Sequence, residues 1–218
     1  MTKFFLFFWF LFSFSVTKAQ SIDPRIFDQL SSEQRMKVLS GEQVYATEKI
    51  ADAPWPQITI FQLIKATPEE CAAVSLDYEL KPQYSHEFKS AKISKSGPGS
   101  QTEVDYLLSV LFLPDEEFTL RYDWSTNEAR NQFDLEWSLV RAKRMKKSWG
   151  RSIFTPHKGN TLLITQLFTD PGIFGARLFA GKATSQTLEV TDSLVKQIEH
   201  EHFFDRQLLE KQIQAIRN

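Results

Sequence analysis

Residues 133–172, FDLEWSLVRAKRMKKSWGRSIFTPHKGNTLLITQLFTDPG, decide the fold of this chain. The segment opens with a strict alternation in which Phe133, Leu135 and Trp137 are separated by polar residues. Successive side chains of a β-strand point to opposite faces, so the alternation predicts a strand with one buried and one solvated face. Short loop signals divide the remainder into two further strands, which predicts consecutive antiparallel hairpins.

The same alternation appears in the two segments before it, around Tyr106 and Tyr122. In all, the sequence predicts seven strands, at residues 57–65, 88–95, 101–113, 117–124, 131–140, 146–155 and 161–169. An antiparallel sheet with one apolar face has to cover that face with another element. The only long helical pattern left runs from about residue 185 to 216. We therefore expect an α+β domain in which a curved, seven-stranded antiparallel sheet wraps around a long C-terminal helix.

Two helix starts can be read locally. Thr67-Pro68-Glu69-Glu70 combines a polar cap, a proline at the first helical position and a glutamate three residues after the cap, which predicts a helix N-terminus. A serine cap at Ser31 or Ser32 and a stop at Gly41 predict a short helix inside an N-terminal extension, residues 20–42. The main domain is then expected to cover residues 43–218.

Residues 1–19 form a different kind of sequence. Lys3 precedes an apolar run, Phe4 to Val16, and small residues at Thr17 and Ala19 follow it. The run is shorter than the roughly 20 residues that span a bilayer, so it is typical of a signal peptide. We expect cleavage near Ala19 and an exported protein, periplasmic or secreted. An uncleaved N-terminal anchor is the alternative.

Composition excludes several classes of site. The chain has 26 basic and 27 acidic residues, which gives no general reason to expect a nucleic-acid partner. A single cysteine, Cys71, rules out an internal disulfide and a cysteine-rich metal site. His200 and His202 are two apart and point away from each other on a helix, so a solvated face is expected there rather than a metal site. No cofactor is expected.

The order of strand, two short helices, six strands and long C-terminal helix is that of the helix-grip fold. The segments that carry a family resemblance are Ile64–Glu70, Trp137–Val140, Ser148–Gly150, Phe154–Pro156 and Gly159–Gly172. They resemble the START-like SRPBCC superfamily, in particular its polyketide-cyclase and coenzyme Q-binding-protein branches, over about residues 43–200. The resemblance implies a hydrophobic small molecule, such as a lipid, quinone or polyketide, held between the sheet and the C-terminal helix.

The inner face of the predicted sheet places a row of small residues beside a row of large ones. If Lys147 and Arg151 face solvent, the same parity turns Ser148, Gly150 and Ser152 inward. Such residues are covered by bulky partners from the helix or leave space for a ligand. The predicted ligand-binding residues are Tyr106, Leu108, Leu120, Tyr122, Trp124, Phe133, Leu135, Trp137, Ser148, Gly150, Ser152 and Phe154.

The turn between the strands at 131–140 and 146–155 is strongly basic. It contains Arg141, Lys143, Arg144, Lys146 and Lys147. One interpretation is a solvated hairpin tip. The other is docking to an anionic membrane surface, since each basic residue near such a surface contributes about 1 kcal/mol.

These observations lead to three hypotheses about function. The first is an exported, non-enzymatic binding or carrier protein for a hydrophobic small molecule, expected to be a monomer. The second is a cyclase or dehydratase that uses tyrosine or acidic groups of the same pocket for acid–base chemistry, although no catalytic residue set stands out. The third is a domain with a filled core that acts through partner contacts.

Overall fold

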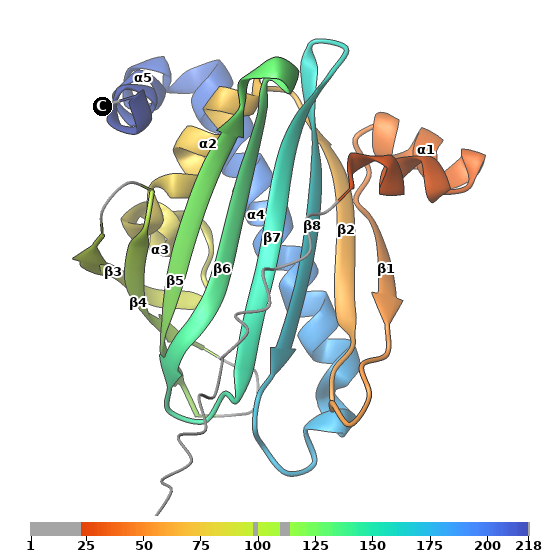
Figure 1. Ribbon diagram of the computed structural model, residues 1–218, viewed down its shortest axis with the longest axis vertical. Coiled ribbons are helices and arrows are strands. Elements are labelled where there is room, and N and C mark those ends of the chain that lie inside the picture. The colour runs from red at the N-terminus through yellow and green to blue at the C-terminus, as the bar shows by residue number, and fades with distance from the viewer. Residues whose placement is uncertain (1–22, 98–99, 110–113, 218) are drawn as a thin grey trace, which may run out of the picture.

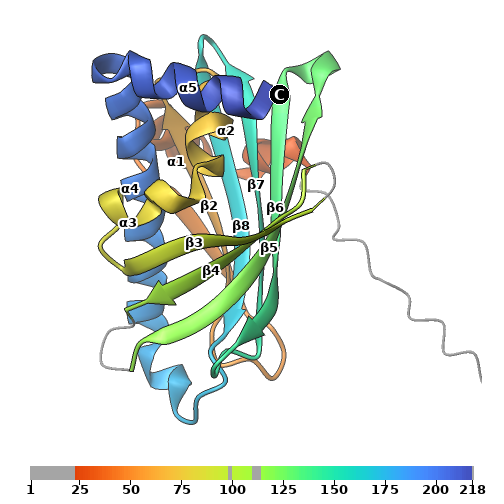
Figure 2. The same ribbon diagram turned by 90° about the vertical axis from the view of Figure 1, so that its left-hand side faces the viewer.

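A computed structural model describes residues 23–97, 100–109 and 114–217. The expected signal peptide, residues 1–19, lies outside the described residues. The fold is one antiparallel sheet, in the order β1-β2-β8-β7-β6-β5-β4-β3, curved around the long helix α4 (Figures 1 and 2). The strands are β1 Val44–Glu48, β2 Gln57–Ile64, β3 Phe88–Ser96, β4 Thr102–Leu108, β5 Glu116–Asn127, β6 Gln132–Ala142, β7 Lys147–His157 and β8 Asn160–Asp170.

The predicted α+β helix-grip architecture is confirmed, with eight strands in place of seven. The additional strand is β1, which pairs with β2 from Val44 to Glu48 and forms one edge of the sheet. The strand predicted at 101–113 is shorter in the structure, where β4 ends at Leu108. Residues 110–113 lie outside the described part of the chain. The helical elements are η1 Pro24–Gln29, α1 Ser32–Leu39, α2 Pro68–Leu76, η2 Tyr78–Leu80, α3 Lys81–Tyr84, η3 Glu128–Arg130, η4 Ala176–Phe179, α4 Ala180–Phe204 and α5 Arg206–Arg217.

Both predicted helix starts form as local chemistry dictates. At α2, the Glu70 backbone N–H donates to the Thr67 hydroxyl (3.3 Å) and the Thr67 N–H donates to the Glu70 carboxylate (2.8 Å). At α1, Ser31 and Gln34 make the same reciprocal pair. Each box satisfies two of the backbone donors that a helix N-terminus otherwise leaves unpaired.

The prediction of one continuous C-terminal helix is wrong. The helix breaks at Asp205, which separates α4 from α5 and accepts a hydrogen bond from the Leu208 N–H (3.2 Å) as a cap for the second helix. The break turns α5 across α2, so that Leu209 becomes fully buried (Figure 2). Phe204, the residue before the break, stays 79% exposed.

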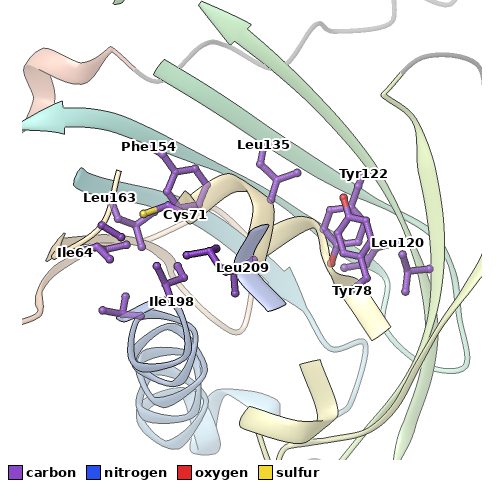
Figure 3. Close-up of a cluster of buried hydrophobic side chains, with 14 of the residues drawn as sticks. Ile64, Cys71, Tyr78, Leu120, Tyr122, Leu135, Phe154, Leu163, Ile198 and Leu209 are labelled. Atoms are coloured by element: carbon purple, nitrogen blue, oxygen red, sulfur yellow. The ribbon is translucent and has the colours of Figure 1, made fainter. Parts of the chain in front are cut away.

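The main core lies between the concave face of the sheet and the helices. Ile64 and Phe154 from the strands meet Cys71 of α2, Ile198 of α4 and Leu209 of α5 there (Figure 3). Burial of this many large apolar side chains in one cluster fixes α4 against the sheet at its C-terminal half.

The convex face of the sheet is only partly solvated, contrary to the expectation of a single apolar face. Phe61, Ile153 and Ile164 point outward from β2, β7 and β8 and are almost fully buried. Phe27 of η1 and Val38 of α1 cover them. The N-terminal extension therefore covers a second hydrophobic core on the convex face of the sheet. As a result, β2 is buried on both faces.

We expect this second core to contribute strongly to stability. Replacing Phe61 by alanine should lower the free energy of unfolding by about 3–5 kcal/mol, because the ring is 2% exposed and packs on Phe27. Tyr45→Ala, on the neighbouring strand β1 with 47% exposure, is the matched control and should change it by less than about 1 kcal/mol. Chemical denaturation measures both. Equal losses in the two variants would show that the convex core is not packed as described.

Candidate functional site

A cavity of about 270 Å³ lies between the concave face of the sheet and the N-terminal half of α4. Its wall is mostly apolar, and it is partly open to solvent. The volume is close to the lower end of the range for small-molecule sites, about 300–1,000 Å³. The cavity therefore has the position, the size and the lining of a binding site for a hydrophobic small molecule.

The space exists because α4 faces the sheet with small side chains over its first turns. Ala183, Thr184, Thr187 and Thr191 line the cavity from the helix. The three threonine hydroxyls donate to helix carbonyls one turn earlier, at 2.9–3.0 Å. Their hydrogen-bonding capacity is thus used within the helix, and no aromatic side chain of α4 lines the cavity in the described residues.

The opposite wall is formed by β7 and β8. Ser148 and Ser152 face the cavity, and their hydroxyls pair across the strands with Thr169 (3.3 Å) and Thr165 (2.8 Å). In each pair one hydroxyl donates and the other accepts, so all four oxygens have a partner within the protein. The strand thus presents short side chains without leaving buried polar atoms unpaired.

Trp137 fills part of the predicted space. Its ring lies over Gly150, where an added Cβ atom would come within 2.1 Å of the Trp137 ring. Glycine at 150 is therefore required for the indole to lie flat on the sheet, and the indole rather than the glycine forms the cavity wall there.

Eight of the twelve predicted ligand-binding residues line the cavity: Leu108, Leu120, Tyr122, Leu135, Trp137, Ser148, Ser152 and Phe154. The other four do not. Gly150 is covered by Trp137, and Trp124 and Phe133 line a separate, much smaller pocket. Tyr106 is buried beside the cavity, with its hydroxyl 3.0 Å from that of Tyr122. The alternation of side chains along the strands identified which face of the sheet lines the cavity, but not how far the cavity extends along that face.

Comparison with solved structures identifies the architecture. A STAR-related lipid transfer protein from Xanthomonas axonopodis superimposes with a TM-score of 0.64 at 11% identity, over 72% of this chain and 93% of that one. Human StAR-related lipid transfer protein 5 gives 0.64 at 12% identity, over 81% and 98%. A Streptomyces aromatase/cyclase gives 0.54 at 13% identity, over 75% and 98%.

The chain has the START-like SRPBCC fold. No family model and no curated protein sequence matches the chain. At these identities, the likeness establishes the fold, and the site has to be argued from the residues of this chain.

Two lining groups of the START-like domain were missed by the sequence analysis. Lys81 and Tyr84, both on the single turn of α3, line the cavity opposite the sheet wall. The sequence predicted two short helices after the first strand of the domain but gave no signal of which way the side chains of the second one point. Four residues are too few for a hydrophobic periodicity to define a face.

The second missed group is an ion pair at the loop end of the cavity. Arg144 pairs with Glu116 (2.7 Å), and the same carboxylate accepts from the Arg144 and Met145 backbone N–H groups at 2.7 and 3.1 Å. Both Glu116 and Arg144 line the cavity. These contacts fasten the β6–β7 turn to β5, and they leave Arg144 with a carboxylate partner inside the protein.

The five residues of the basic turn differ in their surroundings. Arg141 pairs with Asp105 (3.1 Å) and Lys143 with Glu117 (3.9 Å), while Arg144 takes the role just described. Lys146 and Lys147 are exposed, and neither lies within ion-pair distance of a carboxylate in the described residues. Only these two remain as basic groups of the turn without a partner charge.

The tyrosines at the cavity have strongly perturbed acidities. Burial raises the pKa of Tyr122 and of Tyr84 above the usual value for a phenol, and burial together with Tyr122 raises the pKa of Tyr106. All three stay protonated at neutral pH and act as hydrogen-bonding hydroxyls. None is poised as a general base.

No group of histidine, cysteine and acidic residues in the described ranges is arranged to hold a metal. His202, which we expected on a solvated face, instead lies with Nδ1 3.0 Å from a carboxylate oxygen of the buried Glu70. Arg206 pairs with the same carboxylate. The cluster joins α2 to the α4–α5 junction and lies outside the cavity lining.

The contact between Trp137 and Gly150 can be tested directly. Gly150→Ala should lower the free energy of unfolding by about 1–3 kcal/mol, because the new methyl group forces the indole away from the sheet. Gly181→Ala is the matched control, since nothing lies within 4 Å of its Cβ position, and should be neutral or slightly stabilising. Denaturation and near-UV circular dichroism measure the two effects. A Gly150→Ala protein with unchanged stability and spectrum would contradict the placement of the indole.

Proposed function

We propose that this protein is an exported binding or carrier protein for a hydrophobic small molecule, held between the sheet and α4. The observation that carries the proposal is the apolar cavity, which α4 leaves open by facing the sheet with alanine and threonine. An interior of this kind is normally filled to crystal-like density, so a hollow of about 270 Å³ in the core is a feature to be explained by a ligand.

The names of proteins with similar structures support the proposal. Two of the three compared chains carry the words lipid transfer in their names. For the present chain, the class of ligand is argued from its own wall, which is apolar over most of its area. Burial of apolar ligand surface provides the driving force, at about 25 cal/mol per Å².

The lining gives less support to an enzyme of the cyclase or dehydratase kind. Acid–base catalysis is most effective when the pKa of the group lies near the working pH. The cavity phenol pKa values are shifted upward, away from that range. Glu116, the acidic residue of the lining, is engaged by Arg144 and two backbone N–H groups.

We further propose that the end of the molecule formed by the β6–β7 turn and the β8–η4 region docks on an anionic membrane surface. Lys146 and Lys147 lie beside the β8–η4 loop, in which Phe174 is fully exposed, and Leu178 of the following η4 is 86% exposed. The Lys146 N–H donates to the Asp170 carbonyl (2.9 Å), which holds the two segments together at one end of the molecule (Figure 1). Exposed apolar side chains next to unpaired cations suit a lipid headgroup region. We call Lys146, Lys147, Phe174 and Leu178 the docking surface.

None of the helices in the described residues has both the length and the hydropathy to cross a bilayer. A leader cleaved near Ala19 would deliver the domain to the periplasm or the outside. Arg141, Lys143 and Arg144, included in the sequence-based docking hypothesis, are left out of the docking surface because each already has an acidic partner.

The cavity proposal predicts that filling the hollow abolishes binding. Thr187→Trp places an indole in the space from α4, and we expect the affinity for the neutral apolar dye Nile red to fall at least about tenfold, since the dye and the indole compete for one volume. Fluorescence titration measures the affinity, and thermal unfolding verifies that the variant is folded. Glu189→Trp, on the exposed face of the same helix, is the control and should bind as the wild type does. Absence of dye binding to the wild type, or equal binding by both variants, would overturn the proposal.

The docking surface predicts a charge-dependent affinity for vesicles. The double variant Lys146→Glu, Lys147→Glu should lower binding to phosphatidylserine-containing vesicles at least about tenfold, because each cation near the surface is worth about 1 kcal/mol. Co-sedimentation measures the bound fraction. Lys65→Glu, Lys211→Glu makes the same change of charge at exposed sites near the opposite end of the molecule and should bind as the wild type does. If both double variants bind equally, this surface does not dock.

A further inference from the structure

The cavity contains one basic side chain with no acidic partner. Two basic residues line it, Lys81 and Arg144. Arg144 is paired with Glu116, whereas no carboxylate in the described residues lies within ion-pair distance of Lys81. A charge facing an otherwise apolar hollow is rare unless a partner is supplied.

Lys81 is surrounded by aromatic rings in place of acids. Its Nζ lies 5.2 Å from the ring centroids of Phe88 and Tyr106 and 5.8 Å from that of Tyr122. Cation–π contacts offset part of the cost of removing the ammonium group from water. The offset is incomplete, because burial lowers the pKa of Lys81 to about 8. The ammonium form still predominates at neutral pH.

A hydrogen-bond donor lies one helical turn away on the same side. Tyr84 follows Lys81 at i+3 on α3 and also lines the cavity. Its hydroxyl is buried and has no hydrogen-bond partner among residues 23–97, 100–109 and 114–217. A buried hydroxyl normally finds a partner, so this one is open to an acceptor that the protein itself does not supply. By contrast, the Tyr106 and Tyr122 hydroxyls pair with each other.

The combination of one cation, one free hydroxyl and an apolar wall specifies a class of ligand. We propose that Lys81 and Tyr84 form the polar end of the cavity and bind the carboxylate of a hydrophobic carboxylic acid whose apolar body lies along α4 and β7. The inference rests on the proposed binding function and narrows it. A carboxylate carries a single negative charge and accepts from donors on two sides, which matches one ammonium and one phenol.

The fold places this polar end away from the docking surface. Lys81 and Tyr84 belong to α3, whereas Arg144 and Met145 line the cavity from the β6–β7 turn, next to Lys146 and Lys147. An amphipathic acid bound with its carboxylate at α3 would keep its charge on Lys81 and its apolar body within the hollow. This arrangement neutralises the buried ammonium and the ligand charge together.

The proposal predicts a preference for acid over alcohol that depends on Lys81. Dodecanoate and the matched neutral probe dodecanol are measured at pH 7 by displacement of Nile red. We expect wild-type protein to bind dodecanoate at least about tenfold more tightly than dodecanol, since hydrogen bonds to charged groups are the stronger ones. In Lys81→Met this preference should disappear through loss of dodecanoate affinity, with dodecanol and Nile red affinities kept within about threefold. Tyr84→Phe should weaken dodecanoate binding by a smaller factor.

Two controls separate charge recognition from damage to the fold. Lys211→Met removes an exposed lysine on α5 and should bind both probes as the wild type does. Lys81→Met should melt at or above the wild-type temperature, because it removes a half-buried charge that has no acidic partner in the described residues. If it does not fold, Lys81→Gln, which keeps polarity without charge, takes its place.

The outcomes distinguish this inference from the proposed function. Equal affinity of wild-type protein for dodecanoate and dodecanol, or unchanged dodecanoate affinity in Lys81→Met, overturns the carboxylate site while Nile red binding leaves the carrier proposal standing. If Nile red does not bind to the wild-type protein, the carrier proposal fails, and the carboxylate site that rests on it fails with it.

Discussion

The central constraint in this structure is that one helix has to cover a concave antiparallel sheet along its whole length. The C-terminal half of α4 does so with Val195 and Ile198, which are 4% and 0% exposed within the main core. The N-terminal half faces the same sheet with Ala183, Thr184 and Thr187 and leaves a gap. Tight packing at one end of the helix therefore holds the space open at the other, because a helix this long does not bend locally to close it.

The remaining helices pack around the sheet and α4 and hold them in position on either side of the cavity. The N-terminal helices η1 and α1 bury the convex face of β2, β7 and β8 and form a second core. At the other end, Glu70 joins the start of α2 to His202 and Arg206 at the α4–α5 junction. With both faces of the central strands packed, collapse of the sheet onto α4 would disrupt contacts on both sides. A cavity in a small domain is stable only in such a frame.

Polar groups around the cavity separate into satisfied and unsatisfied sets. Ser148 and Ser152 pair with threonines of β8, and the charge of Arg144 is balanced by Glu116, although the Arg144 Nε has no hydrogen-bond partner in the described residues. Within the same part of the chain, Lys81 has no acidic partner and the Tyr84 hydroxyl has no hydrogen-bond partner. Unsatisfied buried polar groups cost stability, and both Lys81 and Tyr84 line the cavity, as the proposed carboxylate site requires.

The sequence by itself determined the class of fold, because local rules decide it. Alternation over Phe133 to Leu139 assigned the inner face, and the Thr67 and Ser31 boxes placed two helix starts. The same alternation predicted that Ser148 and Ser152 face the inner side of the sheet, and both residues line the cavity. Each of these inferences depends on side chains a few residues apart, where backbone geometry relates sequence to direction.

Only the tertiary structure decided what depends on contacts between distant segments. The second core needed the position of α1 over β2 and β7, and the break at Asp205 follows from the packing of α5 on α2. The sequence could not predict that Lys81 and Tyr84 line the cavity. They belong to α3, a single turn whose direction is set by the strands around it. The size and polarity of a cavity depend on the side chains of both of its walls. These side chains come from segments that are distant in the sequence and meet only after the chain has folded.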